Sequence, residues 1–135
     1  MDSIFDAAKY ILEQRGTLST MKLQKLCYYA QAWSLVWDDK PLFEEDFEAW
    51  ANGPVCPQFS VLPEQMKGNS ARLTENQKDT VNRVLEHYGD KNAQWLSQLT
   101  HMEDPWKLAR AETPDRYPSS NIITKESMAM YYGGL

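Results

Sequence analysis

The chain has 135 residues, of which 42% are hydrophobic and 24% charged, and its formal net charge is −5. This length and composition predict one globular domain over residues 1–135, with a core large enough to fold without a disulfide, a metal or a cofactor. The acidic balance argues against general nucleic-acid binding, because that affinity depends on cationic side chains that neutralise phosphates. A local basic patch around Arg15, Lys22 and Lys25 is compatible with this balance.

The two cysteines, Cys27 and Cys56, and an N-terminus without a basic or long apolar segment predict reduced thiols in a cytoplasmic protein. No apolar run approaches the ~20 residues that span a bilayer, so we expect no membrane association. Five tryptophans and seven tyrosines are many for this length, and such side chains serve both in cores and as interface anchors.

The first predicted helix begins after Ser3, a good capping residue, and ends at Gly16. Its apolar positions recur at helical spacing, at Ile4, Ala7, Ala8, Ile11 and Leu12. A short turn leads to a second helix that runs from Ser19 or Thr20 to about Trp37. We expect the two helices to pack as a hairpin.

The second helix has the strongest periodicity in the chain. Its apolar residues fall at steps of three and four, at Leu23, Leu26, Cys27, Ala30, Trp33 and Trp37. Tyr28 and Tyr29 widen this face, and Lys22, Lys25 and Gln31 remain for a polar side. A helix this aromatic needs a partner surface, which is either the core of the domain or another protein.

Residues 41–59 interleave apolar and acidic side chains, and their prolines argue against a long helix. Asn52-Gly53-Pro54 is a turn signal, because glycine tolerates positive φ and proline fixes its own φ. The segment predicts a loop with a short two-stranded β ribbon near residues 46–56. Residues 60–72 are polar and predict a surface connection with room for one helical turn.

Three further helices and a last short one follow. Thr74 and Gln77 form a capping-box pattern, and Gly89 is placed to end that helix. Its inner face is expected at Val81, Val84, Leu85 and Tyr88. Asn92 caps the next helix, whose inner face is expected at Trp95, Leu96, Leu99 and Met102. Asp104-Pro105 begins a short helix, and Thr124 opens the last, which ends near Tyr132. The chain therefore predicts a mainly α fold of about six helices.

The residues that could bind a metal or act in catalysis are dispersed along the sequence. Cys27, Cys56, His87 and His101 are the soft metal ligands, and none forms a close pair, so we predict no metal site. Cys27 lies on an apolar face where a thiolate is disfavoured, and no histidine is placed near the more accessible Cys56. Acidic pairs such as Glu103-Asp104 are typical of solvated surface. We therefore predict no catalytic residues and a protein that is not an enzyme.

The stretch from Met21 to Trp33 resembles the opening signature of the Panacea domain, also found in SocA-like antitoxins and GepA-like phage-associated proteins. Three more stretches agree in order. They are Pro41-Leu42-Phe43 with Glu48-Ala49-Trp50, then Gly53-Pro54-Val55 with Pro57, then Leu99-Thr100-His101 with Pro105-Trp106. Phe59 departs from the tyrosine that the family pattern leads us to expect.

The resemblance implies an antitoxin-like bacterial or phage protein that neutralises a cognate toxin by direct protein–protein contact, as part of a toxin–antitoxin system. Lys22, Lys25, Tyr29 and His101 are the residues expected on the partner-binding surface. The other motif residues are expected to be structural: Leu23, Leu26, Trp33, Trp50, Gly53, Pro54 and Trp106.

Two alternatives remain open at this stage. SocA-like members also deliver their toxin to a protease, so the chain could be an adaptor that binds a protease or another protein without a cognate toxin. A third hypothesis is an enzyme that gathers Lys22, Tyr28, Glu48 and His101 in one cleft with shifted pKa values.

Overall fold

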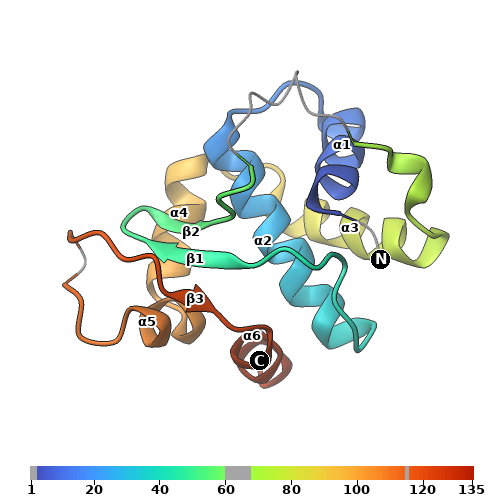
Figure 1. Cartoon of the computed structure of the whole chain (residues 1–135). Helices are drawn as coiled ribbons and strands as arrows, with labels where there is room; N and C mark the ends of the chain where they lie inside the picture. The colour runs from blue at the N-terminus through green and yellow to red at the C-terminus, as the bar shows by residue number, and fades with distance from the viewer. Residues whose placement is uncertain (1–2, 60–67, 115) are drawn as a thin grey trace.

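The computed structural model describes residues 3–59, 68–114 and 116–135, which form a mainly α fold with a small antiparallel sheet (Figure 1). Within these residues there are six α-helices, as the sequence predicts. The elements in chain order are α1 (Ile4–Arg15), α2 (Thr20–Trp37), β1 (Phe47–Trp50), β2 (Gly53–Val55), the 3-10 helix η2 (Ser70–Arg72), α3 (Glu75–Tyr88), α4 (Ala93–His101), α5 (Asp104–Arg110), β3 (Ile122–Ile123) and α6 (Lys125–Gly133).

The helix starts were predictable because their caps are local. Ser3 and Asp6 form a capping box at α1, and Thr74 and Gln77 form one at α3. Each of the side chains of Asn92 and Thr124 accepts a backbone hydrogen bond at the start of its helix. Gly16 ends α1 with a positive φ of 74°, which suits glycine.

Helix α2 runs through the middle of the fold and packs against α1, α3, α4, α6 and β2 (Figure 1). The predicted polar side of this helix is wrong, because Lys25 and Gln31 are each 1% exposed. The amide of Gln31 donates to the carbonyl of Phe43 at 2.8 Å and accepts from the N–H of Leu42 at 2.7 Å. Polar side chains of α2 therefore serve as hydrogen-bond partners for the segments packed on them.

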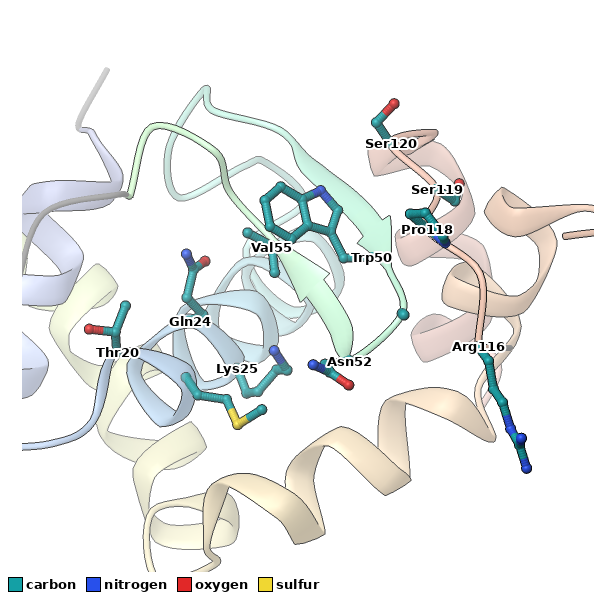
Figure 2. Close-up of a pocket in the computed structure, with 12 residues that line it drawn as sticks. Thr20, Gln24, Lys25, Trp50, Asn52, Val55, Arg116, Pro118, Ser119 and Ser120 are labelled. Atoms are coloured by element: carbon teal, nitrogen blue, oxygen red, sulfur yellow. The ribbon is translucent and has the colours of Figure 1, made fainter. Parts of the chain in front are cut away.

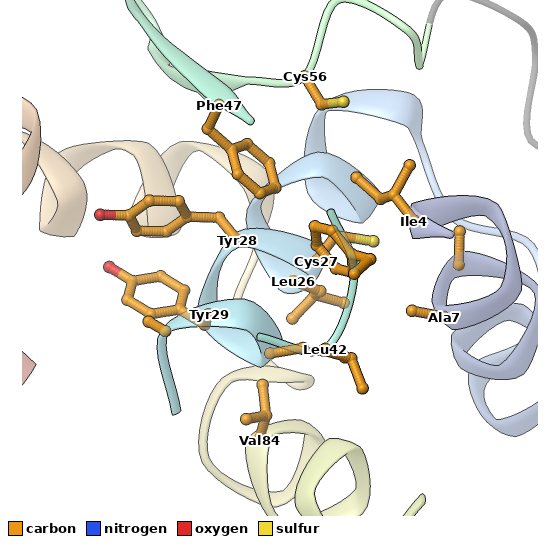
Figure 3. Packing of buried hydrophobic residues seen from close by; sticks show 14 of the residues in the cluster. Ile4, Ala7, Leu26, Cys27, Tyr28, Tyr29, Leu42, Phe47, Cys56 and Val84 are labelled. Carbon is orange, nitrogen blue, oxygen red and sulfur yellow. The ribbon is translucent and has the colours of Figure 1, made fainter. Parts of the chain in front are cut away.

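The core gathers around the middle of α2, where residues 23–32 are all buried (Figure 3). Leu26 and Cys27 pack toward α1 and the loop that carries Leu42, and Tyr28 meets Phe47 of the sheet edge-on, with ring centroids 5.4 Å apart. The aromatic face predicted for this helix therefore packs mainly in the core of the domain.

The sheet has the order β2-β1-β3. β1 pairs with β2 through the turn between Trp50 and Gly53, which confirms the predicted ribbon. On its other edge β1 pairs with β3, with Phe47 opposite Ile123. The sequence did not indicate β3, because two residues are too few for a strand pattern.

Several expected inner faces are corrected. Trp50 is 43% exposed because β1 alternates, with Phe47 and Ala49 turned inward. Trp95 and Met102 are 42% and 65% exposed, whereas Leu96 of the same helix is buried. Cys56, expected to be accessible, is fully buried beside the amide of Gln24.

Of the predicted surface connection at 60–72, residues 60–67 lie outside the described part, and the helical turn is η2. Throughout the described ranges every helix is too short or too polar to cross a lipid bilayer.

Candidate functional site

A groove of about 710 Å³ lies where the first turns of α2, the β1–β2 hairpin and the loop before β3 meet (Figure 2). Its volume lies in the ordinary range of ligand-binding clefts, roughly 300–1,000 Å³. Its walls are formed by Thr20, Met21, Gln24, Lys25, Trp50, Ala51, Asn52, Val55, Arg116, Pro118, Ser119 and Ser120.

The α2 wall follows from helical spacing. The side chain of Ser19 caps the helix by accepting from the N–H of Lys22. Met21 and Lys25 are then four residues apart, one turn along the same face. Gln24 lies beside them and fixes the hairpin to the helix, because its amide accepts from the N–H of Cys56 at 2.9 Å and donates to the carbonyl of Cys56 at 3.3 Å.

Lys25 lies at the floor of the groove, with its amine toward the β1–β2 turn (Figure 2). Its Nζ donates to the carbonyl of Pro54 at 3.2 Å, and the side chain is 1% exposed. Burial lowers the pKa of this amine to about 8, because the charged form loses its hydration. Lys25 is still mainly charged at neutral pH, so it is a buried cation at the base of the groove.

Gly53 allows this close approach. Its φ is +116°, and a Cβ at this position would lie 2.7 Å from Cε of Lys25. Both the backbone conformation and the space therefore require glycine here. The Gly53-Pro54 motif and Lys25 belong to one structural unit, although they are far apart in the sequence.

The hairpin wall is held from behind by α4 and α5. The indole N–H of Trp106 donates to the carbonyl of Trp50 at 2.8 Å, and the guanidinium of Arg110 donates to the carbonyl of Ala49 at 2.8 Å. The hydroxyl of Ser97 donates to the carbonyl of Asn52, also at 2.8 Å. These contacts fix the turn, so the groove is largely preorganised.

The charges of the groove differ from those of the rest of the chain. Lys25 and Arg116 are basic, and no aspartate or glutamate among the described residues lines it. A separate groove beside the sheet is lined by four carboxylates, those of Glu44, Glu45, Asp46 and Glu48. The protein therefore presents a local basic groove on an otherwise acidic chain.

The four residues expected on the partner surface do not lie together. Lys25 lines the groove from below, while Lys22 is half-buried and does not line it. The surface location expected for Lys25 and Tyr29 is wrong, since Tyr29 is fully buried and stacks on Tyr88 with ring centroids 4.2 Å apart. His101 is half-buried and stacks on Trp106 at 4.1 Å. Their role in partner binding stays a prediction.

Most of the motif residues that were expected to be structural are buried, and one is exposed. Leu23, Leu26, Gly53, Pro54 and Trp106 are buried, and Trp33 is half-buried against the core. Trp50 is the exception, because its ring is on the outer face of the hairpin and lines the groove (Figure 2). Strand alternation was the signal that could have placed it there.

Several groove residues could not be predicted from local sequence patterns. Val55 and the stretch from Arg116 to Ser120 meet α2 only through the tertiary fold. Met21 was seen only as part of the helix signature.

Buried ionisable groups also gather around Glu103. Its carboxylate accepts from the hydroxyls of Tyr29 at 2.6 Å and Tyr132 at 2.8 Å, and the hydroxyls of Tyr132 and Tyr28 are hydrogen-bonded to each other at 3.2 Å. Burial raises the pKa of Glu103 above its usual value, and it raises the pKa of the three tyrosines as well. This cluster is enclosed in the core, where it ties α2, α5 and α6 together.

The cysteines are poor candidates for reactive thiolates. Burial raises the pKa of Cys27 and raises that of Cys56 to about 11. Over the described ranges, no group of three or more His, Cys, Asp or Glu side chains is arranged to hold a metal ion.

Comparison with known proteins assigns the chain to a family. Searches of the curated proteins and of the solved structures gave no match. A family model described as antitoxin SocA-like, Panacea domain, matches residues 23–107. The match includes most of α2, the β1–β2 hairpin, α4 and the first half of α5. Because it covers more than half of the 135 residues, the chain belongs to the antitoxin SocA-like, Panacea-domain family.

Proposed function

We propose that this protein neutralises a cognate toxin by binding it directly, as one component of a toxin–antitoxin system. The observation that carries the proposal is the family match, whose residues build two walls of the preorganised groove. A rigid groove with exposed aromatic and apolar side chains is the kind of surface that captures another protein.

We propose further that the protein acts by binding and not by catalysis. Tyr28 is fully buried, whereas the carboxylate of Glu48 lies on the outer face of β1, where it accepts from the indole N–H of Trp50 at 2.8 Å. His101 is half-buried and stacks on Trp106. These groups of the enzyme hypothesis therefore occupy different places, which supports a binding role.

The proposed place of action is the cytoplasm. Cys27 and Cys56 are free thiols in the core, as is typical of proteins from a reducing compartment. An antitoxin in the cytoplasm would bind a toxin that acts on an intracellular target.

The test is co-expression with the product of the adjacent gene in a host whose growth that product arrests. Rescue of growth and recovery of a complex of the two proteins are the expected results. A variant with Leu26→Asp, which places a charge in the core, serves as the unfolded control and should give no rescue. Growth arrest that persists when the wild-type protein is folded and abundant would refute the proposal.

A further inference from the structure

The groove has an apolar part with two different kinds of side chain. Met21 on α2 and Trp50 on β1 are 40% and 43% exposed, although both line a concave surface. Tryptophan offers a large rigid contact, and methionine adapts to the shape of what it meets. The indole N–H of Trp50 is held by Glu48 at 2.8 Å, which fixes the ring in its exposed position.

The other part is cationic. Lys25 lies at the floor, and Arg116 extends from the loop at the outer edge (Figure 2). An ammonium has three N–H donors, and the acceptor recorded for Lys25 within the described residues is the carbonyl of Pro54. At 1% exposure the Lys25 amine acts on a ligand through its charge and not by direct contact, whereas the exposed guanidinium of Arg116 can pair with a carboxylate directly.

Charge complementarity therefore selects the occupant. The chain has 19 acidic and 14 basic residues, and its other groove beside the sheet is lined by carboxylates. An acidic segment is repelled by that surface and attracted to the positive charges of Lys25 and Arg116 in the basic groove. The groove also lies against the turn that α4 and α5 hold in place, so the cost of ordering it on binding is small.

We propose that the groove binds an extended acidic segment of the toxin, with an apolar side chain against Met21 and Trp50 and a carboxylate against Arg116. This inference rests on the proposed function, whose contact surface and partner chemistry it specifies.

The first test measures affinity for the toxin, made by cell-free synthesis, with purified variants of the whole chain. Trp50→Ala should weaken binding at least tenfold, and Arg116→Glu at least fivefold. Trp95→Ala is the matched control, because Trp95 is 42% exposed and does not line the groove, and it should change affinity less than twofold. Thermal unfolding checks that each variant is folded.

The second test identifies the chemistry of the bound segment. Overlapping peptides that tile the toxin sequence compete with the intact toxin for the protein. The expected competitor contains aspartate or glutamate, and its asparagine or glutamine version should compete at least tenfold less well. That difference should shrink when the same two peptides are compared on the Arg116→Glu variant.

The outcomes separate the two proposals. A wild-type complex that is insensitive to Trp50→Ala and Arg116→Glu overturns the groove inference and leaves neutralisation standing. A competing peptide that lacks carboxylates, or the absence of any competing peptide, also overturns the inference alone. Failure of the wild-type protein to bind the toxin overturns both.

Discussion

The hydroxyl of Tyr29 donates a hydrogen bond to the carboxylate of Glu103 at 2.6 Å, between the central helix and the start of α5. Tyr132 of α6 donates to the same oxygen at 2.8 Å. One buried carboxylate thus joins three helices that are distant in the sequence. A family signature residue expected on the surface is instead part of the core's polar network.

Replacing Tyr29 with phenylalanine removes one of these two donors and keeps the ring that stacks on Tyr88. We expect the free energy of unfolding to fall by about 1–3 kcal/mol, as is usual for a buried hydrogen bond to a charged group. Urea unfolding measures it. Tyr117→Phe is the control, because Tyr117 is 62% exposed, and it should be nearly neutral. Equal stability of the two variants would show that the Tyr29 hydroxyl contributes little.

Glu103 also predicts a pH dependence of stability. Burial raises its pKa above the ordinary 4.5, although the tyrosine hydrogen bonds act in the opposite direction. The folded state therefore holds the proton more tightly than the unfolded state, so this contribution is present below pH 4.5 and is lost as the pH rises through the folded pKa.

The Glu103→Gln variant keeps an acceptor for both tyrosines and does not titrate. Unfolding free energies of wild type and variant, taken from about pH 4 to about pH 8, isolate the carboxyl group. We expect the wild type to lose stability relative to the variant across this window. A gain instead would mean that the tyrosines stabilise the charged form more than burial disfavours it.

The elements that the sequence predicted correctly are those whose signals are local. Ser3, Thr74, Asn92 and Thr124 cap the next few residues of their own helices, so their partners are adjacent in the chain. The ribbon at Gly53 was predictable for the same reason, since a turn is read from the residues that form it.

The groove could not be predicted in this way, because it is assembled from distant segments. Periodicity assigned Lys25 to a solvated side of α2, but β2 packs over that side and buries it. The loop at Arg116 joins the site only because β3 pairs with β1, and a two-residue strand has no pattern of its own. The fold class followed from local signals, while the site depended on tertiary packing.

Lys25 predicts a second pH effect, opposite in direction to that of Glu103. Burial lowers its pKa from 10.5 to about 8, so the folded state prefers the neutral amine. Its contribution to stability is present above pH 10.5 and is lost as the pH falls through 8. A shift of this size corresponds to about 3 kcal/mol.

The Lys25→Met variant removes the titrating group with little change in volume. The difference in unfolding free energy between wild type and variant should move in favour of the wild type as the pH is raised from 8 to 10.5. Lys9→Met, on the exposed side of α1, is the control and should show no such trend. A flat difference for Lys25→Met would indicate that solvent reaches the amine.

Gly53 should be sensitive to substitution, since it is constrained in two ways. Its φ is +116°, and an added Cβ would lie 2.7 Å from Cε of Lys25 and 3.1 Å from the hydroxyl of Thr100. Gly16 provides the comparison, because its φ is +74° but nothing lies within 4 Å of the added Cβ. We expect Gly16→Ala to cost about 1 kcal/mol from backbone strain, and Gly53→Ala about 2–4 kcal/mol from strain and overpacking together.

A double-mutant cycle separates the two contributions at Gly53. In a Lys25→Ala background the nearest obstruction is gone, so Gly53→Ala should cost about as much as Gly16→Ala. Chemical denaturation of the four proteins gives the coupling free energy between positions 25 and 53. Additive effects would mean that the backbone conformation alone requires glycine. A favourable coupling in the double variant would confirm that this glycine is required by the lysine beneath it.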